Sequence, residues 1–121
     1  MSTESKTETY LSENFVESAG AILFRLSTCE ICILRQSSRH EYLLPKGRHS
    51  VGETRHETAI RETVEETGMP CRLLPVDLPS RLCPSIELGH VPDEVRVHKS
   101  ACEPFAVQHR LHDAGHMKII W

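Results

Sequence analysis

The chain has 121 residues, the usual size of one domain. It is 39% hydrophobic and 26% charged, which is typical of a globular protein and excludes a disordered tail, a collagen-like chain and a membrane protein. The net charge of −3 at pH 7 argues against wholesale nucleic-acid binding, because a phosphate backbone requires a basic surface.

The cysteines and the N-terminus indicate a cellular compartment. Five cysteines at irregular spacing do not make a disulfide framework, so reduced thiols in a cytoplasmic or nuclear protein are the simpler interpretation. Residues 1–14 are polar and acidic and contain no apolar stretch of signal-peptide length. We therefore expect a flexible N-terminal arm over residues 1–14 and one domain over residues 15–121.

The first half of the domain predicts strands. Residues 19–26 and 30–36 are near-continuous apolar runs separated by three residues, which indicates an antiparallel hairpin with both faces covered. A short strand is expected over residues 42–44, because Pro45 follows it. Residues 46–52 are expected to form a loop with glycines near both ends.

A helix is predicted over residues 54–67, followed by Gly68 as its C-terminal stop. The pattern weakens after it, because five prolines divide residues 75–113 into short pieces. We expect short strands over residues 71–74, 86–88, 105–107 and 118–121.

The predicted helix has an acidic and a less polar face. Glu62, Glu65 and Glu66 share one face because they are spaced i, i+3 and i+4. These carboxylates repel one another, and a hard divalent cation with oxygen ligands would compensate. For the helix alone, a solvated acidic face is the alternative. The opposite face can pack against a sheet through Ala59, Ile60, Thr63, Val64 and Thr67.

The residues around this helix resemble the Nudix box, the signature of Nudix hydrolases. A chance match at its seven charged and glycine positions is on the order of one in a hundred million for each starting position. Residues 44–47 (Leu-Pro-Lys-Gly) and 19–22 are also similar to the family, while Thr63 departs from the usual aliphatic residue. The box positions are filled by Gly47, Glu53, Arg61, Glu62, Glu65, Glu66 and Gly68.

This resemblance implies an α/β fold, an α/β/α sandwich around a mixed sheet. It also implies hydrolysis of a diphosphate linkage by water, assisted by Mg²⁺ or Mn²⁺, which screens phosphate charge and lowers the pKa of a bound water. By matching positions, the metal ligands would be Glu62, Glu65, Glu66 and the backbone carbonyl of Gly47.

Further catalytic and substrate-binding residues follow from the same resemblance. Glu53 would brace the box through Arg61, and both belong with the three helix glutamates to the predicted catalytic set. Lys46 would contact substrate phosphate as a point charge, with a solvated loop lysine as the alternative. Apart from the resemblance, four basic residues are expected either to form a cationic rim for phosphates or to be simply solvated: Arg35, Arg39, His40 and Arg48.

Three other groups of residues give weaker evidence of function. The general base is not evident from the sequence, and the candidates are Glu62, Glu87, Glu94 and Glu103. Cys29 and Cys32 have CxxC spacing without a second pair, which favours ordinary thiols over zinc ligands or a redox centre. Surface positions are the default for the late histidines, and a substrate lid is the alternative: His98, His109, His112 and His116.

The chain ends in Ile119-Ile120-Trp121, although chain ends are normally polar. In the family, more strand and usually a helix follow here, so we expect the C-terminal helix to be missing. A shortened piece, a short natural form and a chain completed by a partner all remain open. Apolar sheet surface exposed in this way would favour a homodimer through the C-terminal strand region.

Two functions from different classes follow. The first is a Mg²⁺- or Mn²⁺-dependent hydrolase that cleaves a small-molecule diphosphate: a nucleoside diphosphate derivative, a dinucleoside polyphosphate or a diphosphoinositol polyphosphate. The alternative is a Nudix-fold module that binds a nucleotide or phosphorylated ligand without turnover. A third possibility, an interaction protein that uses the exposed sheet edge, is supported only by the unusual C-terminus. Specificity in this fold comes from loops outside the box, so the sequence does not name the substrate.

Overall fold

The computed structural model describes residues 4–84 and 89–121. Residues 4–11 adopt no helix or strand, and a short 3₁₀ turn, η1 (Ser12–Asn14), leads into the domain. None of the helices in the described ranges is long and apolar enough to cross a membrane.

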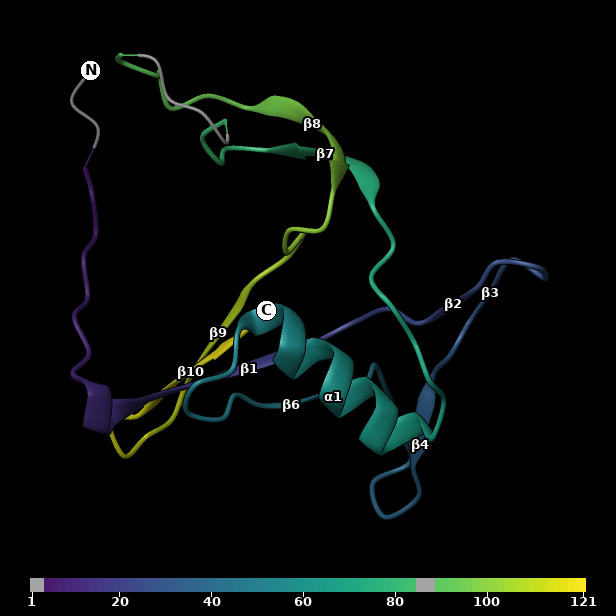
Figure 1. The fold of residues 1–121 in the computed structure, drawn as a ribbon. Helices are drawn as coiled ribbons and strands as arrows, with labels where there is room; N and C mark the ends of the chain where they lie inside the picture. The colour runs from purple at the N-terminus through teal and green to yellow at the C-terminus, as the bar shows by residue number, and fades with distance from the viewer. Residues whose placement is uncertain (1–3, 85–88) are drawn as a thin grey trace.

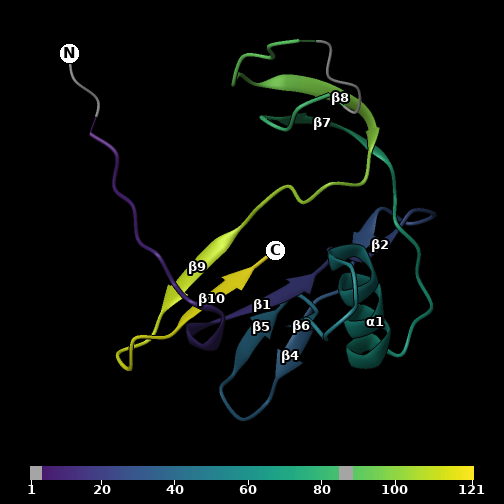
Figure 2. The same cartoon turned by 60° about the vertical axis from the view of Figure 1, so that its left-hand side comes forward.

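A four-stranded mixed sheet organises the molecule, with strand order β6-β1-β10-β9. β1 and β10 are parallel, and the other two pairs are antiparallel. The last strand of the chain is therefore central and pairs with the first (Figures 1 and 2). The four strands are β6 (Lys46–Arg48), β1 (Phe15–Gly20), β10 (Met117–Ile120) and β9 (Gln108–Leu111).

The described residues also form three separate two-stranded hairpins. The hairpin β7–β8 projects away from the helix and the mixed sheet in both views (Figures 1 and 2). The hairpins are β2 (Phe24–Arg25) with β3 (Glu30–Ile31), β4 (Leu34–Gln36) with β5 (Glu41–Leu43), and β7 (Val76–Ser80) with β8 (Arg96–Ala101).

The helix α1 (Arg55–Thr67) packs against β1 and β6 and buries Thr58, Ala59 and Thr63. The Thr54 side chain accepts a hydrogen bond from the backbone N–H of Glu57, and the Glu57 carboxylate accepts one from the backbone N–H of Thr54. This capping box satisfies N–H groups that the helix leaves unpaired at its start. Gly68 ends the helix with a left-handed φ of 71°.

The predicted mixed α/β fold and the predicted helix are confirmed. α1 covers one face of the sheet, and the described residues contain no second α-helix that could cover the other. The buried hydrophobic residues of the described chain are few and belong to β1, α1 and β10: Ala19, Ala59, Met117 and Ile120.

Several strand predictions are wrong in extent. The predicted strand 19–26 is divided, because β1 ends at Gly20 and β2 begins only at Phe24. The predicted strand 30–36 is likewise interrupted between β3 and β4. The hairpin between them is confirmed, but its faces are open to solvent: Phe24 is 50% exposed and Ile31 is 48% exposed. An apolar run reports strand propensity, whereas burial depends on which distant element covers the strand.

Other differences arise where long-range pairing decides the structure. Residues 46–48 form β6 instead of a loop, because they pair with β1. Residues 71–74 and 105–107 form no strand, and β7, β8 and β9 lie elsewhere in the chain. β7 tolerates Pro79 because it pairs with β8 alone. The terminal strand is one residue earlier than predicted, and the predicted strand 86–88 lies outside the described residues.

Candidate active site

An ion pair joins the loop after β6 to α1. The Glu53 carboxylate accepts hydrogen bonds from Arg61 Nε at 2.6 Å and from Arg61 Nη2 at 2.9 Å. It also accepts from the Ser50 backbone N–H and the Thr58 hydroxyl, each at 3.0 Å. The Arg61 hydrogen bonds first, and then those from Ser50 and Thr58, lower the pKa of Glu53 from 4.5 to about 2. Glu53 is therefore fully ionised at neutral pH.

Arg61 extends this contact to the acidic face of the helix. Its Nη1 donates to Glu62 Oε1 at 2.8 Å and approaches both oxygens of Glu65 at 3.4 Å. Its Nη2 donates to the backbone carbonyl of Arg48 at 3.0 Å. These carboxylates, Glu53 above all, raise the pKa of Arg61. Arg61 thus fixes α1 relative to β6, as the predicted bracing by Glu53 requires.

β6 lies directly against the acidic face. A Cβ atom at Gly47 would collide with the carboxylate of Glu62, so any side chain there would push that carboxylate away from β6. One turn further along α1, Glu66 Oε1 accepts a hydrogen bond from the Lys46 backbone N–H at 2.9 Å. The sequence therefore places two of the three helix glutamates beside the backbone of residues 46–47.

The donor chemistry of this face fits a hard divalent cation, because carboxylate and carbonyl oxygens are the ligands that Mg²⁺ prefers. The Oε2 atoms of Glu62 and Glu66 have no hydrogen-bond partner among the described residues. The Glu65 side chain is 57% exposed, and its carboxylate lies 3.4 Å from Arg61 Nη1. This weak contact leaves the carboxylate free to turn toward a cation. As the side chains stand, no three acidic, histidine or cysteine groups of the described chain converge into a metal cluster.

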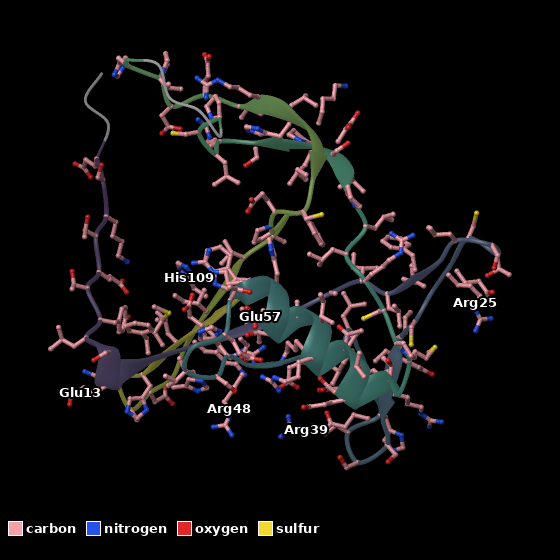
Figure 3. The ribbon with its side chains drawn as sticks, viewed as in Figure 1. Glu13, Arg25, Arg39, Arg48, Glu57 and His109 are labelled. Atoms are coloured by element: carbon pink, nitrogen blue, oxygen red, sulfur yellow. The ribbon has the colours of Figure 1, made fainter. Side chains whose placement is uncertain are left out.

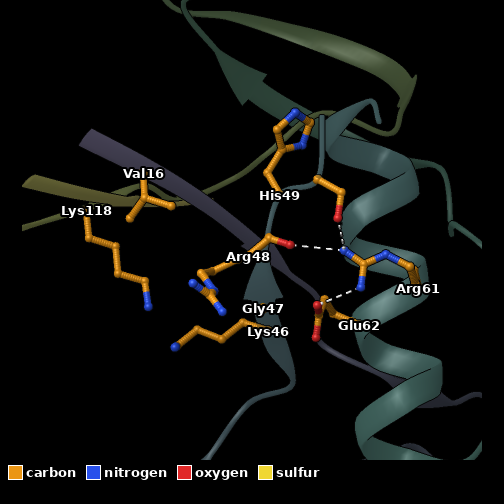
Figure 4. Close-up of a pocket in the computed structure, with 9 residues that line it drawn as sticks. Val16, Lys46, Gly47, Arg48, His49, Arg61, Glu62 and Lys118 are labelled. Atoms are coloured by element: carbon orange, nitrogen blue, oxygen red, sulfur yellow. Dashed lines mark hydrogen bonds and ion pairs between the residues drawn. The ribbon is translucent and has the colours of Figure 1, made fainter. Parts of the chain in front are cut away.

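A cavity of about 640 Å³ opens beside this face. Lys46, Arg48, Arg61 and Lys118 line it, and Glu62 is the one carboxylate in its described lining. Figure 4 shows the Lys46, Arg48 and Lys118 side chains turned toward a common region on the opposite side of β6 from α1. The cavity is therefore cationic and lies next to the candidate metal ligands.

The predicted substrate-binding residues are only partly brought together. Lys46 and Arg48 line the cavity, whereas Arg35 lies on β4 opposite Tyr42 and does not. Arg39 and His40 lie in the exposed turn between β4 and β5 and are also absent from the lining. Figure 3 shows the Arg39 and Arg48 side chains extending away from the ribbon.

None of the later acidic residues proposed as general base lies at this cavity in the described chain. Glu94 pairs with Arg96 at 3.2 Å, and Glu103 lies beside the start of α1 in a separate cavity of about 330 Å³. Glu87 lies outside the described residues. Glu62 alone of the four candidates lines the main cavity.

The late histidines also lie elsewhere. His98 Nε2 is 3.0 Å from the Leu82 carbonyl, His109 is exposed on β9, and the other two lie at the β9–β10 turn. Cys29 and Cys32 are free thiols at the β2–β3 hairpin. The described residues thus offer these cysteines no further ligands for a metal.

Sequence reasoning missed two ionisable residues of the cavity, His49 and Lys118. His49 Nδ1 lies 2.9 Å from the Thr58 hydroxyl, which itself binds Glu53. Lys118 stands alone among apolar residues in the terminal strand, and an isolated cation within such a strand was the one signal for it.

Comparison with known protein families accounts for this arrangement. The family profile described as NUDIX domain matches residues 15–109, so the chain belongs to the Nudix family. No curated protein matches the chain. Nudix proteins are generally pyrophosphohydrolases that act on nucleoside diphosphate-linked substrates with Mg²⁺ or Mn²⁺. The predicted Nudix-type α/β fold is confirmed, with a single α-helix in the described residues.

Proposed function

We propose that this chain hydrolyses the phosphoanhydride linkage of a small diphosphate with the help of Mg²⁺ or Mn²⁺. The substrate class comprises nucleoside diphosphate derivatives, dinucleoside polyphosphates and diphosphoinositol polyphosphates. The observation that carries the proposal is the position of Glu62 and Glu66 against the backbone of residues 46–47, beside a cationic cavity.

Each residue of the proposed site has a separate role. Glu62, Glu65 and Glu66 would hold the cation together with the Gly47 carbonyl, and Arg61 and Glu53 keep the helix and β6 in register. Lys46 and Arg48 would neutralise phosphate oxygens from the other side of β6. A divalent ion bound there would screen the charge of the diphosphate and activate a water molecule.

One observation favours a second candidate, a module that binds a phosphorylated ligand without turnover. Arg61 engages Glu62 and Glu65, and no cluster of three ligating groups is assembled among the described residues. If Arg61 kept these contacts in solution, the cationic cavity would still bind phosphate, but the carboxylates would not bind a cation.

Hydrolysis of a panel of nucleotide sugars, dinucleoside polyphosphates, nucleoside triphosphates and diphosphoinositol polyphosphates tests the proposal. We expect turnover with Mg²⁺ or Mn²⁺ and none after chelation. Glu65→Gln and Glu66→Gln should each lower kcat by about 10³-fold, since each removes a charged ligand of the cation.

Glu30→Gln on the exposed β3 strand is the matched control and should keep the wild-type rate. Wild-type rates in both helix variants would contradict the mechanism. Calorimetric binding across the panel without product release, with Mn²⁺ present, would establish the binding module instead.

The compartment and the assembly are further parts of the proposal. We place the protein in the cytoplasm or nucleus, where cysteines remain reduced. We also propose a homodimer through the C-terminal strand region, since β9 is an exposed edge of the sheet. Sedimentation of the purified chain measures this, and a monomer at all concentrations would contradict it.

A further inference from the structure

Four cations lie together on the face of the sheet opposite α1. Because Gly47 faces Glu62 of α1, its neighbours Lys46 and Arg48 point to the other face. The register places Lys118 beside Val16, two residues from the partner of Arg48, and so on that same face. Arg110 on β9 is the direct cross-strand partner of Lys118. We call these four residues the sheet cations.

The sheet cations are not neutralised by ion pairs within the described chain. None of them forms an ion pair with a carboxylate there, whereas Arg25, Arg61, Arg96 and Lys99 all do. Like charges directly opposite each other in a ladder are destabilising. Burial, and then repulsion from Lys46, Arg110 and Arg48, lowers the pKa of the half-buried Lys118. A bound anion would remove this repulsion.

The same cavity connects three of these cations with the catalytic face, and Arg110 lies beside it as the cross-strand partner of Lys118. Its lining includes Lys46, Arg48 and Lys118 on one side of β6 and Glu62 and Arg61 on the other (Figure 4). Its volume of about 640 Å³ is within the range of small-molecule sites. The imidazole of His49 is the one aromatic ring in the described lining, so the cavity offers little stacking surface for a nucleobase.

We propose that Lys118 and Arg110, with Lys46 and Arg48, form a phosphate-binding subsite that selects ligands carrying phosphate groups beyond the diphosphate that is cleaved. The proposal rests on the proposed function for the position of the cleaved diphosphate. Lys118 and Arg110 are its specificity-determining residues, because a substrate with only two phosphates can be held at Lys46 and Arg48 near the helix. A compact polyanion reaches all four cations.

Binding of myo-inositol hexakisphosphate, measured calorimetrically with a chelator present, tests the subsite separately from cation binding. We expect saturable binding that weakens with added salt. Lys118→Met and Arg110→Gln should each weaken it by about tenfold or more, the usual effect of one charge-assisted hydrogen bond. Lys118→Arg, which keeps the charge, should retain most of the affinity.

The matched control is Lys99→Met, because Lys99 is an exposed strand lysine paired with Asp77 on the β7–β8 hairpin. It should bind within about twofold of wild type. Equal affinity in wild type, Lys118→Met and Arg110→Gln would overturn the subsite. Arg110 is exposed, so its variant remains informative if Lys118→Met fails to fold.

Hydrolysis gives an independent measurement. In Lys118→Met, the ratio of kcat/KM for a dinucleoside pentaphosphate to that for ADP-ribose should fall about tenfold, and an unchanged ratio would contradict the inference. If no substrate is cleaved but the variants lose hexakisphosphate binding, the hydrolase proposal fails and the subsite stands. If substrates are cleaved and the variants bind hexakisphosphate as wild type does, the subsite fails and the hydrolase proposal stands.

Discussion

Hydrogen bonds between Arg61 and its neighbours lower the pKa of Glu53 and raise that of Arg61. Glu53 accepts four hydrogen bonds, from Arg61 twice, from Ser50 and from Thr58. Its acidity is a consequence of the fold, since the donors come from a loop and from two turns of α1. The pH dependence of stability should therefore report whether this network is formed.

We expect an acid-induced loss of stability that depends on Glu53. The folded-state pKa of about 2 lies below the ordinary 4.5, so the stabilisation is complete above about 4.5 and is lost as the pH falls toward 2. Urea unfolding from pH 6 to pH 2.5 measures it. Glu53→Gln should flatten the profile in that window, and an unchanged slope in the variant would contradict the assigned network.

Gly47 gives a second prediction for a single residue. In Gly47→Ala the new Cβ would displace the Glu62 carboxylate from β6. A displacement of about 1 Å in a catalytic group lowers the rate on the order of 10²-fold, so we expect that loss in kcat. Steady-state kinetics measures the loss in kcat, and a thermal melt shows whether the variant is also less stable. A variant with wild-type kcat would show that the close approach is dispensable.

At the scale of elements, α1 was predictable because its signals are local. Gly68 ends the helix as expected, and Thr54 and Glu57, which also lie at fixed offsets from the helix start, form its capping box. The strands were less predictable, because β6 and β9 exist through pairing with β1 and β10 rather than through their own composition. Gln108–Leu111 is mostly polar and exposed throughout, which no pattern of alternation would mark as a strand.

The capping box gives a prediction at this scale. Thr54→Ala removes the side-chain acceptor for the Glu57 N–H and should lower the free energy of unfolding by about 1 kcal/mol. For a domain of this size the Tm would fall by roughly 4 °C. Differential scanning calorimetry measures it, and Thr54→Ser, which keeps the hydroxyl, is the control. Equal destabilisation by both variants would show that the cap is not the cause.

At the scale of the whole molecule, Trp121 ties the last strand to the first strand and the helix. Its backbone N–H donates to the Ser18 carbonyl at 2.9 Å, and its indole N–H donates to Glu17 at 2.9 Å. The Arg55 guanidinium lies 3.9 Å from the centre of the ring. The two hydrogen bonds join residues more than a hundred positions apart in the chain.

We expect Trp121→Ala to destabilise the domain by roughly 2 kcal/mol, through loss of the cation–π contact and of the hydrogen bond to a charged group. Trp121→Phe keeps the ring and should lose about half of that. Chemical denaturation followed by circular dichroism measures both variants. Because Trp121 is the single tryptophan, wild-type fluorescence also reports its docking. Wild-type stability in Trp121→Ala would contradict the coupling.

The sequence by itself determined the helix and its acidic face, because both follow from helical spacing within a short segment that Gly68 ends. The contact between Glu53 and Arg61 was implied by the resemblance to the Nudix box, and the structure contains it. Only the tertiary structure decided which cations join that face. Arg35 is closer to the box in sequence than Lys118, yet it lies on β4 and does not line the cavity. Lys118 lies about fifty residues beyond the helix, and the parallel pairing of β10 with β1 brings it to the cavity. Strand pairing is a long-range choice among competing partners, so the local sequence does not encode it.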